Sequence, residues 1–444
     1  MPAQLNRSLI ASIGAILFAP LWLVHRTPQL VVIIVMVFGF GLVPFLEVDY
    51  RVAAEVILYA LSAVVINSTL MRAGWGGVYF RPWRKSMLLF LVLWLVGILV
   101  GIVYDKNDLG WVDARRYVGW LALFPFCLAE QRRIGAIHRS VMIVTLLGAI
   151  ELILQAFTSQ VILAGMKGTM VGATEGFDDV KRGSIEGANY LLVYIIIYCA
   201  GMRSMIKGGY KAVLLGLAGA TAFLALILVF SRGLWLGALV GGIIAHLCVR
   251  GKRLRAIAVI PVVLALATGG VYAVSLINPH LTDAIVSRII SVKEEGDAGT
   301  SVGARFDENV QAWESIEKNP VLGLGHGGEY KKMLRAWDDG FVNEATFIHN
   351  AYLWFLVKFG ILGALFVGAL IYLVWRNLRH LRKNGVERSE DVCQLAALGT
   401  FFCMLISGMS TPFLAQYSDL IALSAVLIII SGVNTRRERF ALYG

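Results

Sequence analysis

The chain has 444 residues, of which 58% are hydrophobic and only 16% are charged, and its mean hydropathy is +0.73. Soluble domains are roughly 45–50% apolar even when glycine is counted, so this composition excludes a large soluble core and predicts an integral membrane protein. The formal net charge of +11 is interpreted as a topology signal, and no nucleic-acid partner is predicted.

Apolar runs long enough to cross a hydrocarbon core recur along almost the whole chain. We predict an all-α polytopic membrane protein with about 12 transmembrane helices, in contact with membrane lipids. One of the two runs before residue 47 is expected to be incomplete or strongly tilted, because the polar sequence HRTPQ separates them. In chain order the candidate runs are 9–24, 30–46, 52–71, 86–104, 116–130, 140–164, 188–206, 211–231, 233–249, 256–277, 350–375, 393–412 and 417–433.

Basic connections alternate along the second half of the chain. They lie at 130–139, 203–211, 250–255, 375–383 and 436–439. Lys and Arg concentrate in cytoplasmic loops, so these connections are predicted to be cytoplasmic. The remaining connections are predicted to face the periplasm of a bacterium, which makes this a multi-pass protein of the inner membrane. These are 165–187, 231–233, 278–348 and 412–418.

The longest of these connections, 278–348, has mixed polarity and is too long for an idle loop in a compact protein. We predict two or three short amphipathic helices on the membrane surface, at 282–292 and 306–319. The second carries Phe306, Val310, Trp313 and Ile316 at helical spacing. The chain is therefore divided into an N-terminal transmembrane bundle (1–277), a periplasmic segment (278–348) and C-terminal transmembrane helices (349–444).

His349 and Asn350 stand at the predicted periplasmic start of the 350–375 run. An imidazole titrates near neutrality, so at the water–lipid boundary it is suited to general-base chemistry on a lipid-borne substrate. The alternative is a histidine that merely begins a helix in the headgroup region. Asn350 is a second catalytic candidate, and Tyr352 is a candidate for substrate binding.

Arg232 lies in the short break between two long apolar runs. A guanidinium near the membrane edge is costly unless it pairs with an anion, and phosphate is the natural ligand. Snorkelling to lipid headgroups is the alternative. Arg305 is predicted to open the second amphipathic helix, where the cation and the helix N-terminus together form an anion site. A solvated arginine paired with Asp307 or Glu308 is the ordinary alternative.

Lys181 and Arg182 lie in another predicted periplasmic loop and are expected to reach the same pocket. The neighbouring Asp178-Asp179 pair, like Asp338-Asp339, is interpreted as hydrated surface, and a divalent ion held on a diphosphate is the alternative. Glu151 is expected to face the interior of the bundle against a polar partner. No metal and no cofactor are predicted.

Together these residues resemble the O-antigen ligase and polymerase superfamily of bacterial membrane glycosyltransferases. The ligase signature of that family is His-Asn, nine residues, Gly, two residues and a small residue, and it is matched by His349-Asn350, Gly360 and Gly363. A second family feature is an arginine followed four residues later by leucine, matched by Arg232 and Leu236. A third stretch is matched by Arg305, Trp313, Asn319-Pro320, Gly323 and Gly325, with Ala304 where the family most often has glycine.

The resemblance implies transfer of a polysaccharide from undecaprenyl diphosphate to an outer-core sugar of lipid A-core, by a metal-independent inverting mechanism. In that scheme His349 is the general base and Asn350 orients it or a sugar hydroxyl. Arg232 and Arg305 stabilise the leaving diphosphate, with Arg182 as a weaker third. Gly360 and Gly363 are expected to let their helix pack closely against a neighbour.

Three alternatives remain open from the sequence. An O-antigen or exopolysaccharide polymerase, and a protein O-oligosaccharyltransferase, would use the same donor with another acceptor. A flippase for lipid-linked oligosaccharides would also present arginines to a diphosphate. The flippase is disfavoured because no clear internal repeat is visible and the candidate residues gather on one side of the membrane.

Overall fold

The computed structural model describes residues between 81 and 430, with gaps. The predicted runs 9–24, 30–46, 52–71 and 256–277, the predicted helix 282–292 and both Asp-Asp pairs lie outside these residues. The described residues are 81–105, 110–111, 113–114, 117, 134–158, 169–170, 181–182, 188–206, 208–247, 301–330, 334–337, 340–343, 348–384, 389–414, 419–420 and 422–430.

The described chain is mainly helical. Its helices are α4 (Arg81–Ile98), the π-helix η3 (Leu99–Tyr104) that continues it, α6 (Ile134–Thr158), α7 (Ala188–Met205), α8 (Tyr210–Leu228), α9 (Arg232–Leu247), α12 (Ser301–Lys318), α13 (Ala351–Asn384) and α14 (Ser389–Ser407). Residues 419–420 and 422–430 are also helical. Two short antiparallel ladders pair β1 (Thr169–Met170) with β2 (Lys181–Arg182) and β3 (Leu334–Trp337) with β4 (Gly340–Asn343).

Four of the described helices are long and apolar enough to cross a membrane. They are Ile137–Ala156, Tyr210–Leu228, Ala351–Arg379 and Ser389–Ser407, and Leu89–Val103 and Arg232–Leu247 are shorter apolar helices. A multi-pass membrane protein is therefore confirmed. The total of about 12 spans stays a prediction, since it includes runs outside the described residues.

Helix ends differ from the predicted runs at polar flanks. α6 begins at Ile134, before the predicted 140, and α13 continues past residue 375 to Asn384. Hydropathy marks the part of a helix that is immersed in lipid, whereas backbone hydrogen bonding continues into basic flanks whose long side chains reach water.

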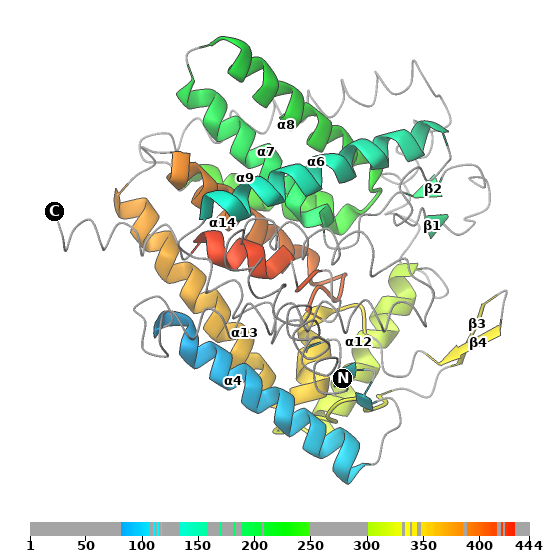
Figure 1. Ribbon diagram of the computed structural model, residues 1–444. Helices are drawn as coiled ribbons and strands as arrows, with labels where there is room; N and C mark the ends of the chain where they lie inside the picture. The colour runs from blue at the N-terminus through cyan, green and yellow to red at the C-terminus, as the bar shows by residue number, and fades with distance from the viewer. Residues whose placement is uncertain are drawn as a thin grey trace, which may run out of the picture.

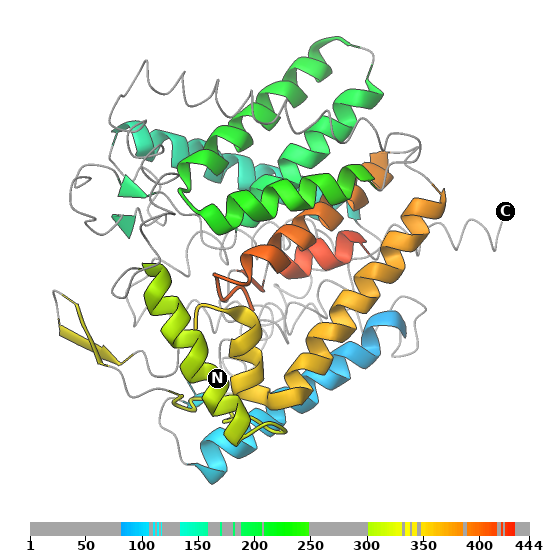
Figure 2. The ribbon, with the colours of Figure 1, turned by 180° about the vertical axis from the view of Figure 1, so that it is seen from behind.

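The helices form three layers (Figures 1 and 2). α6, α7, α8 and α9 make one outer layer, α14 and residues 422–430 lie in the middle, and α13 with α4 makes the other outer layer. α9 and α14 approach closely because glycines face each other. A Cβ on Gly241 would lie 2.2 Å from the Gly399 oxygen, and one on Gly237 would lie 2.6 Å from the Cys403 oxygen.

The amphipathic helix α12 presents its large apolar side chains outward. Phe306, Val310 and Trp313 are exposed, whereas Ile316 is buried beside Ala312. Of the four large apolar residues only Ile316 is buried, because the face that packs on α13 carries small and polar residues. An exposed apolar stripe is what an interfacial helix presents to a bilayer, and the position of α12 on the membrane surface stays a prediction.

α13 is interrupted at Gly360, whose φ of 56° and ψ of −148° lie outside the helical region. The loop that follows α12, residues 319–328, fills the break, and we call it the insertion loop. Leu324 N donates to Val357 O at 2.7 Å, Gly325 N to Lys358 O at 3.0 Å, and Ile361 N to Pro320 O at 2.9 Å. These bonds satisfy backbone groups that the interruption would otherwise leave unpaired.

The break gives Gly360 a different role from the predicted packing against a neighbouring helix. A Cβ there would lie 2.3 Å from the Val321 oxygen, and a non-glycine residue at this φ is strained by about 1–2 kcal/mol. The signature glycine exists because the insertion loop occupies the space of a side chain.

Gly360→Ala is expected to lower the free energy of unfolding by about 2 kcal/mol or more, from backbone strain and the collision with the insertion loop. Thermal unfolding in detergent measures it. The matched control is Gly368→Ala in the same helix, where an added Cβ meets nothing within 4 Å and alanine is neutral or stabilising. Equal unfolding midpoints for the two variants would contradict this account of the break.

Candidate functional site

His349 lies two residues before the first residue of α13 and is held by Glu308 of α12. The Nδ1 atom of His349 lies 3.0 Å from Oε2 of Glu308, and the backbone N–H of His349 donates to the same oxygen at 3.0 Å. The imidazole is 31% exposed, whereas the carboxyl is 5% exposed. The buried carboxylate of Glu308 thus fixes the orientation of the solvent-accessible imidazole of His349.

This geometry determines which ring nitrogen is available for chemistry. Oε2 of Glu308 already accepts the backbone N–H, so it is an acceptor in the side-chain contact as well, and Nδ1 of His349 carries the hydrogen. In this tautomer the lone pair is on Nε2, which is the ring nitrogen that can accept a proton. Catalytic histidines are commonly oriented in this way by a carboxylate on the other ring nitrogen.

Arg305 lies one turn before Glu308 on α12 and is partly buried. Residues three apart share a helix face, so the guanidinium and the carboxylate extend from the same side of α12. The helix begins at Ser301. The prediction that Arg305 opens the helix is therefore wrong, and its part in the site stays a prediction that rests on the helix face it shares with Glu308.

Asn350 caps α13. Its Oδ1 accepts the backbone N–H groups of Tyr352 at 3.0 Å and Leu353 at 3.3 Å, which is how asparagine satisfies the first turn of a helix. Its predicted role in orienting His349 or a sugar hydroxyl stays a prediction. Tyr352 donates its hydroxyl to Leu405 O at 2.5 Å, so this side chain joins α13 to α14, and substrate binding by its ring also stays a prediction.

Arg232 is positioned by a strained turn between α8 and α9. Phe230 has a φ of 53°, the only positive φ of a non-glycine residue among the described residues. Trp235 fastens the turn, since its Nε1 donates to Leu226 O at 2.8 Å and its backbone N–H to Ser231 O at 3.0 Å. Strain that the surrounding structure maintains is typical of functional positions.

The C-terminal end of α14 joins these parts. Ser407 donates its hydroxyl to Gly233 O at 2.9 Å, next to Arg232, and Gly408 O accepts the N–H of Ala351 at 2.8 Å, just after His349. Arg232, Arg305 and His349 therefore lie at one end of the helix bundle, which we call the His349 end.

Lys181 and Arg182 form β2, where Lys181 pairs with Met170 and Arg182 with Thr169. This ladder lies on the same side of the bundle as α12 in both views (Figures 1 and 2). Only the backbone of these two residues is described, so their binding to substrate stays a prediction.

Glu151 faces the interior as predicted. It is buried in α6, and Oε1 of Glu151 accepts from Nε2 of Gln155 at 3.0 Å. The described residues contain no group of three or more His, Cys, Asp or Glu side chains arranged to hold a metal ion.

The described helices and the His349 end belong to a multi-pass membrane protein with a histidine, a buried carboxylate and arginines at one end. Residues 217–368 match the family model described as O-Antigen ligase. The matched range contains Arg232, Arg305, Glu308 and His349. A comparison with curated proteins found no match. The family supports a membrane glycosyltransferase activity of O-antigen ligase or polymerase type.

Proposed function

We propose that this protein is an O-antigen ligase at the periplasmic face of the bacterial inner membrane. It transfers polysaccharide from undecaprenyl diphosphate to an outer-core sugar of lipid A-core. The observation that carries the proposal is the contact between Glu308 and His349, at the end of the bundle that also holds Arg232 and Arg305. A base and cations for a diphosphate are the groups that such a transfer requires.

In the transfer step, Nε2 of His349 removes the proton of the acceptor hydroxyl. The hydroxyl oxygen forms a bond to the anomeric carbon of the donor sugar as the bond from that carbon to the diphosphate oxygen breaks. The bonding electrons leave with undecaprenyl diphosphate, and attack from the opposite face inverts the anomeric configuration. Glu308 stabilises the imidazolium that forms.

Guanidinium groups stabilise the departing diphosphate. Arginine forms bidentate, charge-assisted hydrogen bonds with phosphate oxygens, and its charge does not depend on pH in the working range. Arg232 and Arg305 supply this charge, with Arg182 as a third candidate. We therefore expect the reaction to proceed without an added divalent metal.

The test is a reconstituted transfer assay with purified protein, undecaprenyl-diphosphate-linked glycan and lipid A-core, in the presence of a chelator. The proposal expects a glycan–lipid A-core product that requires lipid A-core. Glycan elongation without lipid A-core would identify a polymerase, and transfer to protein a protein O-oligosaccharyltransferase. Donor crossing the bilayer with no new glycosidic bond would identify a flippase. Loss of activity in chelator, restored by a divalent metal, would contradict the arginine mechanism.

Replacing the orienting carboxylate should weaken catalysis without removing it. Glu308→Gln is expected to lower kcat about 10- to 100-fold, because the amide holds the imidazole less firmly and does not stabilise its charged form. The KM for the donor should change little. Steady-state assays with Glu314→Gln, an exposed position on the same helix, provide the control. Wild-type kcat in Glu308→Gln would show that the contact has no catalytic role.

A further inference from the structure

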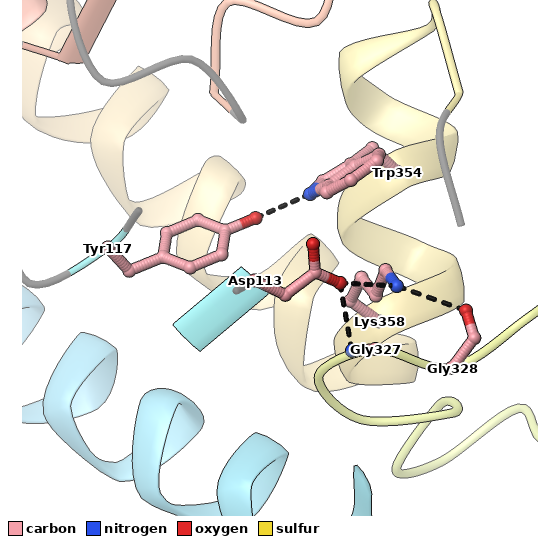
Figure 3. Close-up of polar contacts among 6 residues, drawn as sticks. All are labelled: Asp113, Tyr117, Gly327, Gly328, Trp354 and Lys358. Atoms are coloured by element: carbon pink, nitrogen blue, oxygen red, sulfur yellow. Dashed lines mark hydrogen bonds and ion pairs between the residues drawn. The ribbon is translucent and has the colours of Figure 1, made fainter. Parts of the chain in front are cut away.

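A buried ion pair lies beside the break in α13. Nζ of Lys358 is 2.7 Å from Oδ2 of Asp113, and the two side chains are 0% and 3% exposed. Both charges also contact the end of the insertion loop (Figure 3). Gly327 N donates to Oδ2 of Asp113 at 2.8 Å, and Lys358 donates to Gly328 O at 3.0 Å.

The surroundings of the pair are aromatic and tightly packed. The ammonium of Lys358 lies 5.1 Å from the centre of the Trp354 ring, and the indole N–H of Trp354 donates to the Tyr117 hydroxyl (Figure 3). Next to it His326 of the insertion loop is fully buried. Burial lowers the pKa of His326 to about 4, so it is neutral at pH 7 and adds no charge to the cluster.

The insertion loop is clamped from two sides. On one side it completes the hydrogen bonds of α13, as described above. On the other side His326 N donates to Gly97 O of α4 at 2.9 Å, and a Cβ on Gly101 would lie 2.0 Å from the His326 oxygen. The loop is therefore held between α4 and α13, with the Asp113–Lys358 pair at its end.

A buried ion pair is a weak explanation of stability alone. Removing two charges from water costs several kcal/mol per ion, and apolar replacements of similar volume are often neutral or stabilising. What such a pair can supply is one defined arrangement of the groups that it joins. Here those groups are a helix, a loop and the segment around Asp113, which lie far apart in the chain.

The insertion loop connects this pair to the site. It begins where α12 ends, and α12 carries Glu308, while Lys358 belongs to the helix that starts just after His349. α12 and α13 are thus joined at two places, by the insertion loop at one and by the Glu308–His349 contact at the other. A shift of the loop would change the distance between Glu308 and His349.

We propose that Asp113 and Lys358 are positioning residues for the transfer reaction. Their ion pair fixes the insertion loop in the break of α13, and the fixed loop holds α12 where Glu308 reaches His349. This inference rests on the proposed function, because it assigns the pair an effect on the base of that reaction.

The test is a double-mutant cycle between Lys358→Met and Glu308→Gln in the transfer assay. Lys358→Met alone is expected to lower kcat about tenfold with little change in the KM for the donor, since displacements near 1 Å are costly to catalysis. Because both changes act on one contact, the double variant should be no more than about threefold slower than Glu308→Gln. If Lys358→Met merely reduced the amount of folded protein, it would lower the activity by the same factor in the wild type and in Glu308→Gln. Multiplicative losses, or wild-type kcat in folded Lys358→Met, would overturn the proposal.

Further variants control for the loss of a charge and for misfolding. Lys318→Met, at an exposed position that ends α12, controls for charge removal and should retain wild-type kcat. If Lys358→Met does not fold, the cycle is run with Asp113→Leu/Lys358→Met, which removes both buried charges together; it should fold, keep the reduced kcat and show the same coupling. Recovery of wild-type kcat in this double variant would overturn the positioning role. His349→Ala in the same assay separates the two proposals, because full activity there would defeat the proposed function itself.

Discussion

His349→Ala is expected to lower kcat for polysaccharide transfer about 10³- to 10⁴-fold, the largest effect of any single substitution in this protein. The variant has no Nε2 to accept the hydroxyl proton, and general-base catalysis commonly contributes about 10²- to 10⁴-fold. The backbone N–H of residue 349 can still donate to Glu308 in the variant, so the loss reports the missing imidazole. Single-turnover transfer to lipid A-core measures the chemical step.

Binding of the donor should survive this substitution, because the arginines assigned to the diphosphate are unchanged. The matched control is His246→Ala, a histidine in the last turn of α9, at the opposite end of the helix from Arg232. It should retain wild-type kcat. Transfer by folded His349→Ala at the rate of this control would eliminate His349 as the base.

Arg232→Ala is expected to lower kcat about 10²- to 10³-fold, which is the usual cost of removing one preorganised group that stabilises developing charge. The charge on the leaving diphosphate grows in the transition state, so kcat should fall more than affinity for the donor. Arg232→Lys should recover only part of the rate, because an ammonium does not form the bidentate contact of a guanidinium. Steady-state kinetics with donor at varied concentration separate kcat from KM.

The control for charge at the membrane edge is Arg203→Ala, an exposed arginine in the last turn of α7. If Arg232 merely snorkels to headgroups, the two alanine variants should behave alike. A rate loss confined to Arg232→Ala, and partly restored by lysine, is the outcome that the diphosphate role requires. Arg305→Ala should resemble Arg232→Ala if both groups act on the same leaving group.

The side of the membrane on which the site residues lie was predictable, because it depends on the composition of short segments. The lengths of apolar runs and the alternation of basic connections are properties of short segments. They indicated that Arg232, Arg305 and His349 belong at the same end of a helix bundle. The contacts of α14 place Arg232 and His349 there, and the Glu308–His349 contact brings α12, which carries Arg305, to the same end. The resemblance was confirmed over residues 217–368 because its motifs are also local in sequence.

The partner of His349 could not be predicted in this way. Glu308 is separated from it by 41 residues, and in sequence it looked like an ordinary surface partner for Arg305. Glu308 is buried because α12 packs on α13 through a face of small and polar residues. Apolar periodicity in the sequence does not predict such a face. The only available signal was its position one turn after Arg305.

The sequence by itself determined that the protein is a multi-pass membrane protein and where polar loops interrupt its apolar runs. It also determined that His349 and Arg232 stand at helix ends. These features follow from the cost of placing backbone and charge in hydrocarbon, which every short segment meets separately. Only the tertiary structure decided that Glu308 orients His349, that Gly360 receives the insertion loop, and that Asp113 meets Lys358. Those contacts join distant segments, and their formation depends on the packing of whole helices and not on the preference of any residue alone.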